Sequence, residues 1–191
     1  MSLTEIEFVL TANQFALMDY PGLTQGRSLT LTLDGGVLLS DPAADAWFVV
    51  QKEPLMSQFV RVGPATYAFM GQITEANLFK EEGEETAVLL VRCGDIPLRV
   101  ICAPNEDGRL PFGTWETRFI SGLCRVQGIV DDDFATGIGQ TVDATVWGIN
   151  RLVLAPGDPK FGQWYETTEL STSPYIYDLV LITARVHPKS M

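Results

Sequence analysis

The stretch VLLVRCGDIPLRVIC, residues 88–102, constrains the fold most, because a Gly-Asp step separates two apolar runs. Glycine readily takes the positive φ of the first central position in a type II′ turn, so the sequence predicts a β-hairpin with Gly94-Asp95 as its loop. This turn fixes the facing positions on the two strands: 93 with 96, 91 with 98, 89 with 100 and 87 with 102. One face is then wholly apolar, and a slip of one residue would bury two arginines.

Two of the three cysteines, Cys93 and Cys102, lie on this apolar face. Six residues of extended chain separate the turn from Cys102, so the two side chains are about 20 Å apart. A disulfide needs Cα atoms within about 7 Å, and zinc ligands must come as close. We therefore expect Cys93, Cys102 and Cys124 to be buried, reduced and unligated.

Alternating apolar and β-branched residues recur along the chain with turn signals about every ten positions, whereas long 3.6-residue periods are missing. Strand-like segments at 66–79, 113–133 and 140–154 flank the hairpin, and their interior glycines are typical of bulges and bends. Five strands with a long link after the third resemble the OB-fold, a five-stranded Greek-key barrel. The sequence predicts an all-β protein that contains an OB-like barrel.

This barrel, at residues 66–157, sets the expected domain organisation. Residues 1–65 have at least three further strand-like runs, which form either a second small barrel or an extension of the first. Residues 158–191 form a loop and then a strand or short helix that packs on the barrel. Ser173-Pro174 favours a helix start, but the Tyr, Ile, Val and Thr residues that follow favour a strand, which we prefer.

The second face of the hairpin is the candidate binding face, because OB-folds bind ligands on their second and third strands. It carries Arg92 and Arg99, which could contact phosphates, together with Leu90 and Ile101. Proteins that bind single strands stack bases on aromatic side chains, and this face has none. We expect it to be covered by another segment of the chain or by a partner protein, and favour cover from within the chain.

The formal charge of −11, from 13 basic and 24 acidic residues, repels phosphate backbones and anionic lipids. We therefore expect no nucleic-acid partner, unless the six arginines between 88 and 151 converge on one groove. No apolar run approaches the roughly 18 residues of a membrane span, and the N-terminus lacks the pattern of a secretory signal. A cytoplasmic location without membrane attachment is expected, and an odd number of cysteines fits reduced thiols there.

Side chains for catalysis are few and unfavourably spaced. His187 is the only histidine and lies near the C-terminus, where the rigid geometry of acid–base chemistry is seldom found. Asp131, Asp132 and Asp133 lack the spacing of a calcium loop, and the four glutamates around Gly83 are typical of a solvated hairpin tip. With no complete nucleotide motif either, the sequence predicts no cofactor and no metal.

These features favour a soluble all-β protein that acts by binding or assembly, not by catalysis. A partner protein or a second copy of the chain is the expected partner. Two alternatives stay open: an OB-fold binder of nucleic acid or oligosaccharide that uses the barrel loops, and a hydrolase that depends on carboxylates.

Overall fold

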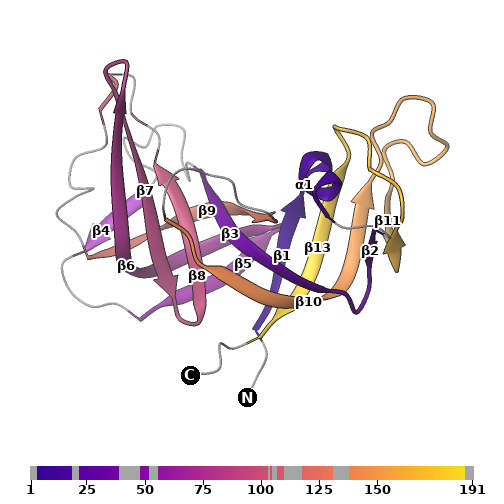
Figure 1. Ribbon diagram of the computed structural model, residues 1–191, viewed down its shortest axis with the longest axis horizontal. Helices are drawn as coiled ribbons and strands as arrows, with labels where there is room; N and C mark the ends of the chain where they lie inside the picture. The colour runs from indigo at the N-terminus through magenta and orange to yellow at the C-terminus, as the bar shows by residue number, and fades with distance from the viewer. Residues whose placement is uncertain are drawn as a thin grey trace. The chain divides into compact units, whose positions relative to one another are not determined.

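The computed structural model describes residues 4–18, 22–38, 48–51, 56–102, 104, 107–109, 118–130 and 138–187 (Figure 1). These residues form thirteen β-strands and one helix, α1 (Ala12–Ala16), so the all-β prediction is confirmed. The described part of the chain contains no helix that is long and apolar enough to cross a membrane. The first strands are β1 (Thr4–Leu10), β2 (Leu23–Thr24), β3 (Ser28–Leu38), β4 (Phe48–Gln51), β5 (Gln58–Gly63) and β6 (Thr66–Glu81). The remaining strands are β7 (Glu84–Cys93), β8 (Ile96–Cys102), β9 (Phe119–Ile129), β10 (Thr141–Leu152), β11 (Trp164–Thr167), β12 (Glu169–Leu170) and β13 (Leu179–Val186).

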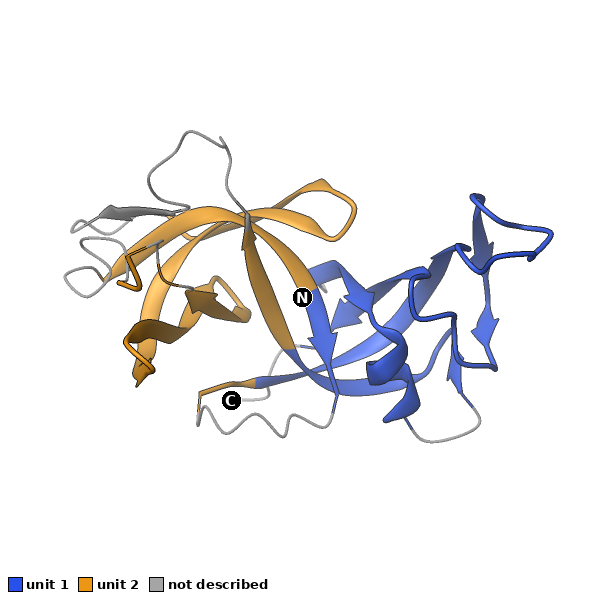
Figure 2. Ribbon diagram, turned by 90° about the horizontal axis from the view of Figure 1, so that it is seen from above, with its two compact units in different colours: residues 1–32, 127–132, 141–191 blue, residues 33–126, 133–140 orange. Residues whose placement is uncertain are grey.

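The chain divides into two compact units, which Figure 2 shows in different colours. Unit 1 contains residues 1–32, 127–132 and 141–191, and unit 2 contains residues 33–126 and 133–140. Strands β3 and β9 therefore contribute residues to both units. Compactness does not test whether a segment folds alone, and the domain bounds expected from the sequence, 1–65, 66–157 and 158–191, stay a prediction.

Five strands that contribute to unit 2 follow one another in a ring. In this ring β6 pairs with β7, β7 with β8, β8 with β3, and β3 with β9, which returns to β6. The β3–β8 pair is parallel, and the β6–β7, β7–β8 and β6–β9 pairs are antiparallel. Strand β5 pairs with β6 and β4 with β9, so both lie outside the ring.

The expected fifth strand of the barrel, residues 140–154, is a strand but has other partners. It forms β10, which pairs with β11, with β13 and with the first half of β3. The ring of unit 2 is completed instead by the second half of β3, Leu33 to Gly36, which pairs with β8. Alternation shows that a segment is a strand, but its pairing partner is decided by tertiary contacts that a local pattern does not encode.

The hairpin of β7 and β8 has the predicted register. Cys93 pairs with Ile96, and at the far end Ala87 pairs with Cys102. Gly94 has a φ of 66°, as the predicted turn requires. All eight side chains of the apolar face are at most 4% exposed: Ala87, Leu89, Val91, Cys93, Ile96, Leu98, Val100 and Cys102. This face forms a large part of the core of unit 2.

Strand β6 changes partners at Gly71. Residues Thr66 to Gln72 pair with β9, and residues Gln72 to Glu81 pair with β7. A Cβ atom on Gly71 would lie 2.5 Å from the carbonyl oxygen of Arg92, a distance that real Cβ atoms essentially never show. The sequence predicts bulges and bends at interior glycines, whereas at Gly71 the glycine permits a close approach of two backbones that a larger residue would prevent.

Unit 1 is built on β1, β13 and β10. Strand β13 pairs antiparallel with both β1 and β10, and the buried side of β10 and β13 carries Val142, Ala144, Val146, Ile149, Val180, Ile182, Ala184 and Val186. Residues 179–186 are therefore a strand, and the helical alternative for this segment is wrong. Residues of the N-terminal segment form β1 to β5, which confirms the additional strands expected there.

Replacing Gly71 by alanine is expected to lower the free energy of unfolding by about 1–3 kcal/mol, since the added methyl group must displace the backbone of β7. Urea unfolding of both proteins measures this change. Gly36→Ala is the matched control, because its Cβ would meet only the Arg125 carbonyl oxygen, at an ordinary 3.6 Å. Equal stability of Gly71→Ala and the wild type would contradict the close approach.

Candidate binding surface

The four residues of the predicted binding face occupy different environments. Arg99 is fully buried, and its Nε donates a hydrogen bond of 2.9 Å to Oδ1 of Asp34, its neighbour across β3 and β8. Leu90 is 4% exposed and Ile101 is half-buried. Arg92 is exposed, and it donates a hydrogen bond of 2.9 Å to Oε1 of Gln140.

Residues from later in the chain cover part of this face. Ile138 packs with Val88 and Leu90, and the half-buried Ile101 lies against the same cluster. The sequence favours cover from within the chain, and Ile138 provides it for Val88 and Leu90. Of the four residues, Arg92 is exposed, whereas Arg99 and Leu90 are buried. A binding role for the four residues stays a prediction.

The three cysteines are buried inside unit 2. None of the three forms a disulfide, and burial raises the thiol pKa of Cys93, Cys102 and Cys124 to about 12 in each case. Such thiols are protonated near neutral pH and are poor nucleophiles and poor metal ligands. Their predicted burial is confirmed, and their redox and ligand state in the cell stays a prediction.

The remaining candidates from the sequence do not assemble into a reactive site in the described residues. His187 Nε2 lies 2.8 Å from Thr145 Oγ1, and the His187 amide donates to the carbonyl oxygen of Asp143. The glutamates of the β6–β7 hairpin tip are exposed or half-buried at 81–85, and residues 131–133 lie outside the described part. No group of three or more His, Cys, Asp or Glu side chains that could hold a metal occurs among the described residues.

Large exposed hydrophobic side chains gather in a segment that the sequence analysis did not single out. Of the eleven such side chains among the described residues, five lie between positions 161 and 177. They are Phe161, Trp164, Tyr175, Ile176 and Tyr177. Single exposed apolar residues are ordinary, but this concentration within 17 residues marks a candidate interaction site.

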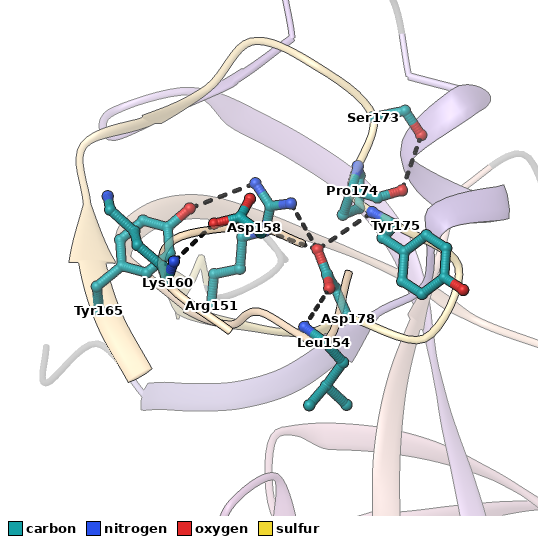
Figure 3. Close-up of polar contacts among 9 residues, drawn as sticks. All are labelled: Arg151, Leu154, Asp158, Lys160, Tyr165, Ser173, Pro174, Tyr175 and Asp178. Carbon is teal, nitrogen blue, oxygen red and sulfur yellow. Dashed lines mark hydrogen bonds and ion pairs between the residues drawn. The ribbon is translucent and has the colours of Figure 1, made fainter. Parts of the chain in front are cut away.

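The buried carboxylate of Asp178 accepts hydrogen bonds from the segment that follows β10 and from the segment that precedes β13 (Figure 3). Its Oδ1 accepts a hydrogen bond of 2.7 Å from the Leu154 amide, in the segment that follows β10. Its Oδ2 accepts hydrogen bonds from Arg151, with Nε at 2.9 Å and one terminal nitrogen at 2.5 Å, and from the Tyr175 amide at 3.1 Å. The Asp178 side chain is fully buried, and these donors balance its charge.

The electrostatics of Asp178 follow from these contacts. Burial alone raises the pKa of a carboxyl group, but the Leu154 amide, the Arg151 guanidinium and the Tyr175 amide outweigh it and lower the pKa of Asp178 below the ordinary 3.8. The carboxylate therefore stays ionised at neutral pH. The hydrogen bonds of Asp178 described above all come from donors, so its carboxylate is suited to holding the backbone in place and not to proton transfer.

Arg151 extends the same network to β11. Its second terminal nitrogen lies 3.3 Å from the hydroxyl oxygen of Tyr165, and Lys160 Nζ lies 4.0 Å from the centroid of the Tyr165 ring. The Lys160 amide donates to Oδ1 of Asp158 at 2.8 Å. In Figure 3, Tyr165 and Tyr175 lie on opposite sides of the Arg151–Asp178 pair. One ion pair thus fixes the loop after β10 and the segment before β13.

Residues Tyr175 to Asp178 form a closed turn, which we name the aromatic turn. The Asp178 amide donates to the Tyr175 carbonyl oxygen at 2.8 Å, while the Asp178 carboxylate accepts from the Tyr175 amide. Its two central residues, Ile176 and Tyr177, are 65% and 70% exposed, and the rings of Tyr175 and Tyr177 meet edge to face at 5.5 Å. Central turn positions usually carry Gly, Pro, Asn, Asp or Ser. Large apolar side chains on a turn with a fixed backbone are suited to burial against a partner.

Sequence reasoning missed this turn because Tyr and Ile favour strands. A usable signal was present, since Pro174 and Asp178 are both typical turn residues and they bracket Tyr-Ile-Tyr. The hydrogen bonds from Arg151 and Leu154 join positions more than 20 residues away from Asp178, and no local pattern indicates them.

Replacing Asp178 by asparagine is expected to lower the free energy of unfolding at pH 7 by about 3 kcal/mol, because the Arg151 charge loses its buried partner. The lowered pKa means that the wild-type ion pair contributes its stability above about pH 3.8 and loses it as the pH falls below that value. The difference between the two proteins should therefore shrink from pH 7 to pH 3 in urea unfolding. Asp158→Asn, whose Oδ1 accepts from the Lys160 amide, is the control and should cost less than 1 kcal/mol. A penalty that is equal at both pH values would contradict the ionised pair.

Comparison of the chain with protein-family models, with curated proteins and with solved structures finds no match. The function of the chain is therefore inferred from its own geometry. In unit 1 that geometry gives the buried Arg151–Asp178 ion pair and, beside it, a turn of exposed aromatic and aliphatic side chains.

Proposed function

We propose that this chain is a non-catalytic binding protein that docks onto another protein through the aromatic turn. The observation that carries the proposal is the contrast within residues 175–178. The backbone is held by a buried, fully paired carboxylate, while Ile176 and Tyr177 project large apolar surfaces into solvent. Because the backbone of the turn is already ordered, binding a partner loses less conformational entropy than it would for a flexible segment.

The side chains of the turn are efficient binding groups. Complete burial of an Ile or aromatic side chain contributes roughly 1.5–3 kcal/mol, and Tyr loses only two side-chain torsions on binding. The exposed residues that precede the turn, Ser171, Thr172 and Ser173, are small and uncharged. Tyr and Ser together are typical of recognition loops in proteins that bind other proteins.

The charges support a protein partner over nucleic acid or anionic lipid. Arg151 is paired with Asp178, and Lys160 lies over the Tyr165 ring. Glu166 and Glu169 add exposed negative charge nearby in sequence, within a chain of formal charge −11. Phosphate binding depends on cations, so the expectation of no nucleic-acid partner is kept.

Unit 2 serves in this proposal as an OB-like scaffold. The parallel pairing of β3 with β8, and the long β6 shared between β9 and β7, support the resemblance to the OB-fold. The preceding strand β3 takes the ring position that β10 was expected to fill. Arg99 and Leu90, on the strands where OB-folds bind ligands, are buried, which favours a structural role for this unit.

The other parts of the proposal follow from the sequence. The Asp178 carboxylate is held ionised among donors, so it gives no support to the hydrolase alternative. A cytoplasmic location agrees with cysteines that are buried and form no disulfide, since such thiols persist where disulfides are rare.

A photo-crosslinking amino acid at position 177 tests the proposal in the cells that produce the protein. We expect a crosslinked adduct to one protein of defined mass, and we expect Ile176→Ser in the same chain to reduce its yield at least about fivefold. Position 78 is the control, since Leu78 is also exposed, at 53%, but belongs to unit 2.

The same adducts from positions 78 and 177, or no adduct from position 177, would contradict docking through the aromatic turn. An adduct with twice the mass of the chain would identify a second copy as the partner and overturn the choice of a different protein.

A further inference from the structure

The solvent side of β10 and β13 carries polar side chains around one tryptophan. Thr145 pairs with Arg185 across the two strands, and Asp143 pairs with Thr30 on β3. The His187 amide continues the pairing by donating to the Asp143 carbonyl oxygen. We name this surface the Trp147 face and define it by six residues: Thr30, Asp143, Thr145, Trp147, Arg185 and His187.

Trp147 occupies a β-bulge. The register of β10 against β13 passes from Val146–Ala184 directly to Gly148–Thr183, so Trp147 has no partner residue on β13. Bulges of this kind redirect a side chain, and they occur often beside functional sites. Alternation along β10 places Trp147 on the solvent side, and the bulge leaves it without a directly paired residue on β13.

Arg185 fixes the orientation of the indole ring. The guanidinium carbon lies 3.4 Å from a ring centroid of Trp147, which is close enough for a cation–π stack. Trp147 nevertheless remains 47% exposed. The guanidinium stacks on one side of the ring, and we infer that the exposed surface includes the opposite side, which would offer a flat apolar platform.

The polar groups of the face supply both donors and acceptors. Thr145 Oγ1 and His187 Nε2 are 2.8 Å apart and share a hydrogen bond, and the Thr30 hydroxyl donates to Oδ1 of Asp143 at 2.6 Å. Arg185 offers guanidinium N–H groups beside the tryptophan, and Asp143 offers carboxylate lone pairs. A ligand for this face therefore has an apolar side for the ring and several hydroxyl groups that both donate and accept.

We propose that the Trp147 face binds a neutral oligosaccharide. The C–H side of one sugar ring stacks on the open side of the indole, and its hydroxyls bond to Arg185 and to the Thr145–His187 pair. Asp143 lies four residues from Trp147 along β10, about 13 Å away. This distance is longer than one sugar ring, so a ligand that contacts both residues must contain more than one sugar. The proposal rests on residues that the aromatic turn does not use.

The negative charges on and beside the Trp147 face favour neutral sugars over acidic ones. Asp143 lies on the face, Glu5 pairs with Arg185 across β1 and β13, and the formal charge of the chain is −11. Sulfated or uronic-acid sugars would meet both carboxylates, so they bind less well than neutral sugars of equal length.

An array of neutral and acidic oligosaccharides of one to six units, probed with the labelled full chain, tests this inference. We expect saturable binding to neutral oligosaccharides and at least about tenfold weaker binding by Trp147→Ala, which loses the stacking platform. Trp164→Ala is the matched control, because Trp164 is 48% exposed but lies on β11, and it should bind within twofold of the wild type. Trp147→Phe keeps a smaller platform and should show an intermediate loss, which separates stacking from any effect of alanine on folding.

Several results would overturn the inference. They are no binding to any sugar on the array, binding confined to acidic sugars, equal losses for Trp147→Ala and Trp164→Ala, and single sugars that compete as well as longer chains. Crosslinking from position 177 should be unchanged in Trp147→Ala, so the failure of one proposal is distinguishable from the failure of the other.

Discussion

Burial of the β7–β8 hairpin on both faces is the constraint on which unit 2 depends. Its apolar face fills the core, and on its second face Leu90 packs with Ile138 while Arg99 is completely enclosed. A buried guanidinium needs an anion close by, because an unpaired charge in the interior costs several kcal/mol. Asp34 supplies that anion from β3, the parallel neighbour of β8. The hairpin therefore fixes both the core of the ring and the strand that completes it.

Unit 1 uses a second buried ion pair in another way. Arg151 and Asp178 hold irregular backbone instead of strands, and the segments they fix carry exposed aromatic side chains. Because the polar groups at the base of the aromatic turn are paired, its apolar tip can remain in water without loss of order. The buried hydrogen bonds of Asp178 thus stabilise the turn, and the side chains of Ile176 and Tyr177 remain available to contact a partner.

Local turn chemistry explains which parts of the fold were predictable. Gly94 and the alternation around it determine a two-residue turn, its register and its buried face without reference to any other segment. The burial of Arg99 was not predictable, because its partner Asp34 lies 65 residues away in the sequence. The exposure of Tyr177 was not predicted either, because its strand propensity suggests that it belongs to the strand β13 that follows it. For both Arg99 and Tyr177, contacts between distant parts of the sequence determined whether the side chain is buried or exposed. The local sequence pattern predicted the opposite environment.

Amide hydrogen exchange of the free protein, followed by NMR, tests most directly whether the aromatic turn is fixed before it meets a partner. The amides of Leu154, Tyr175 and Asp178 each donate a hydrogen bond within the Asp178 network. The account predicts that these three exchange at least about tenfold more slowly than an unstructured peptide, while Ile176 and Tyr177 exchange faster than they do. Exchange of all five amides at the unstructured rate would show that the turn is not formed in the free protein, and would contradict the account.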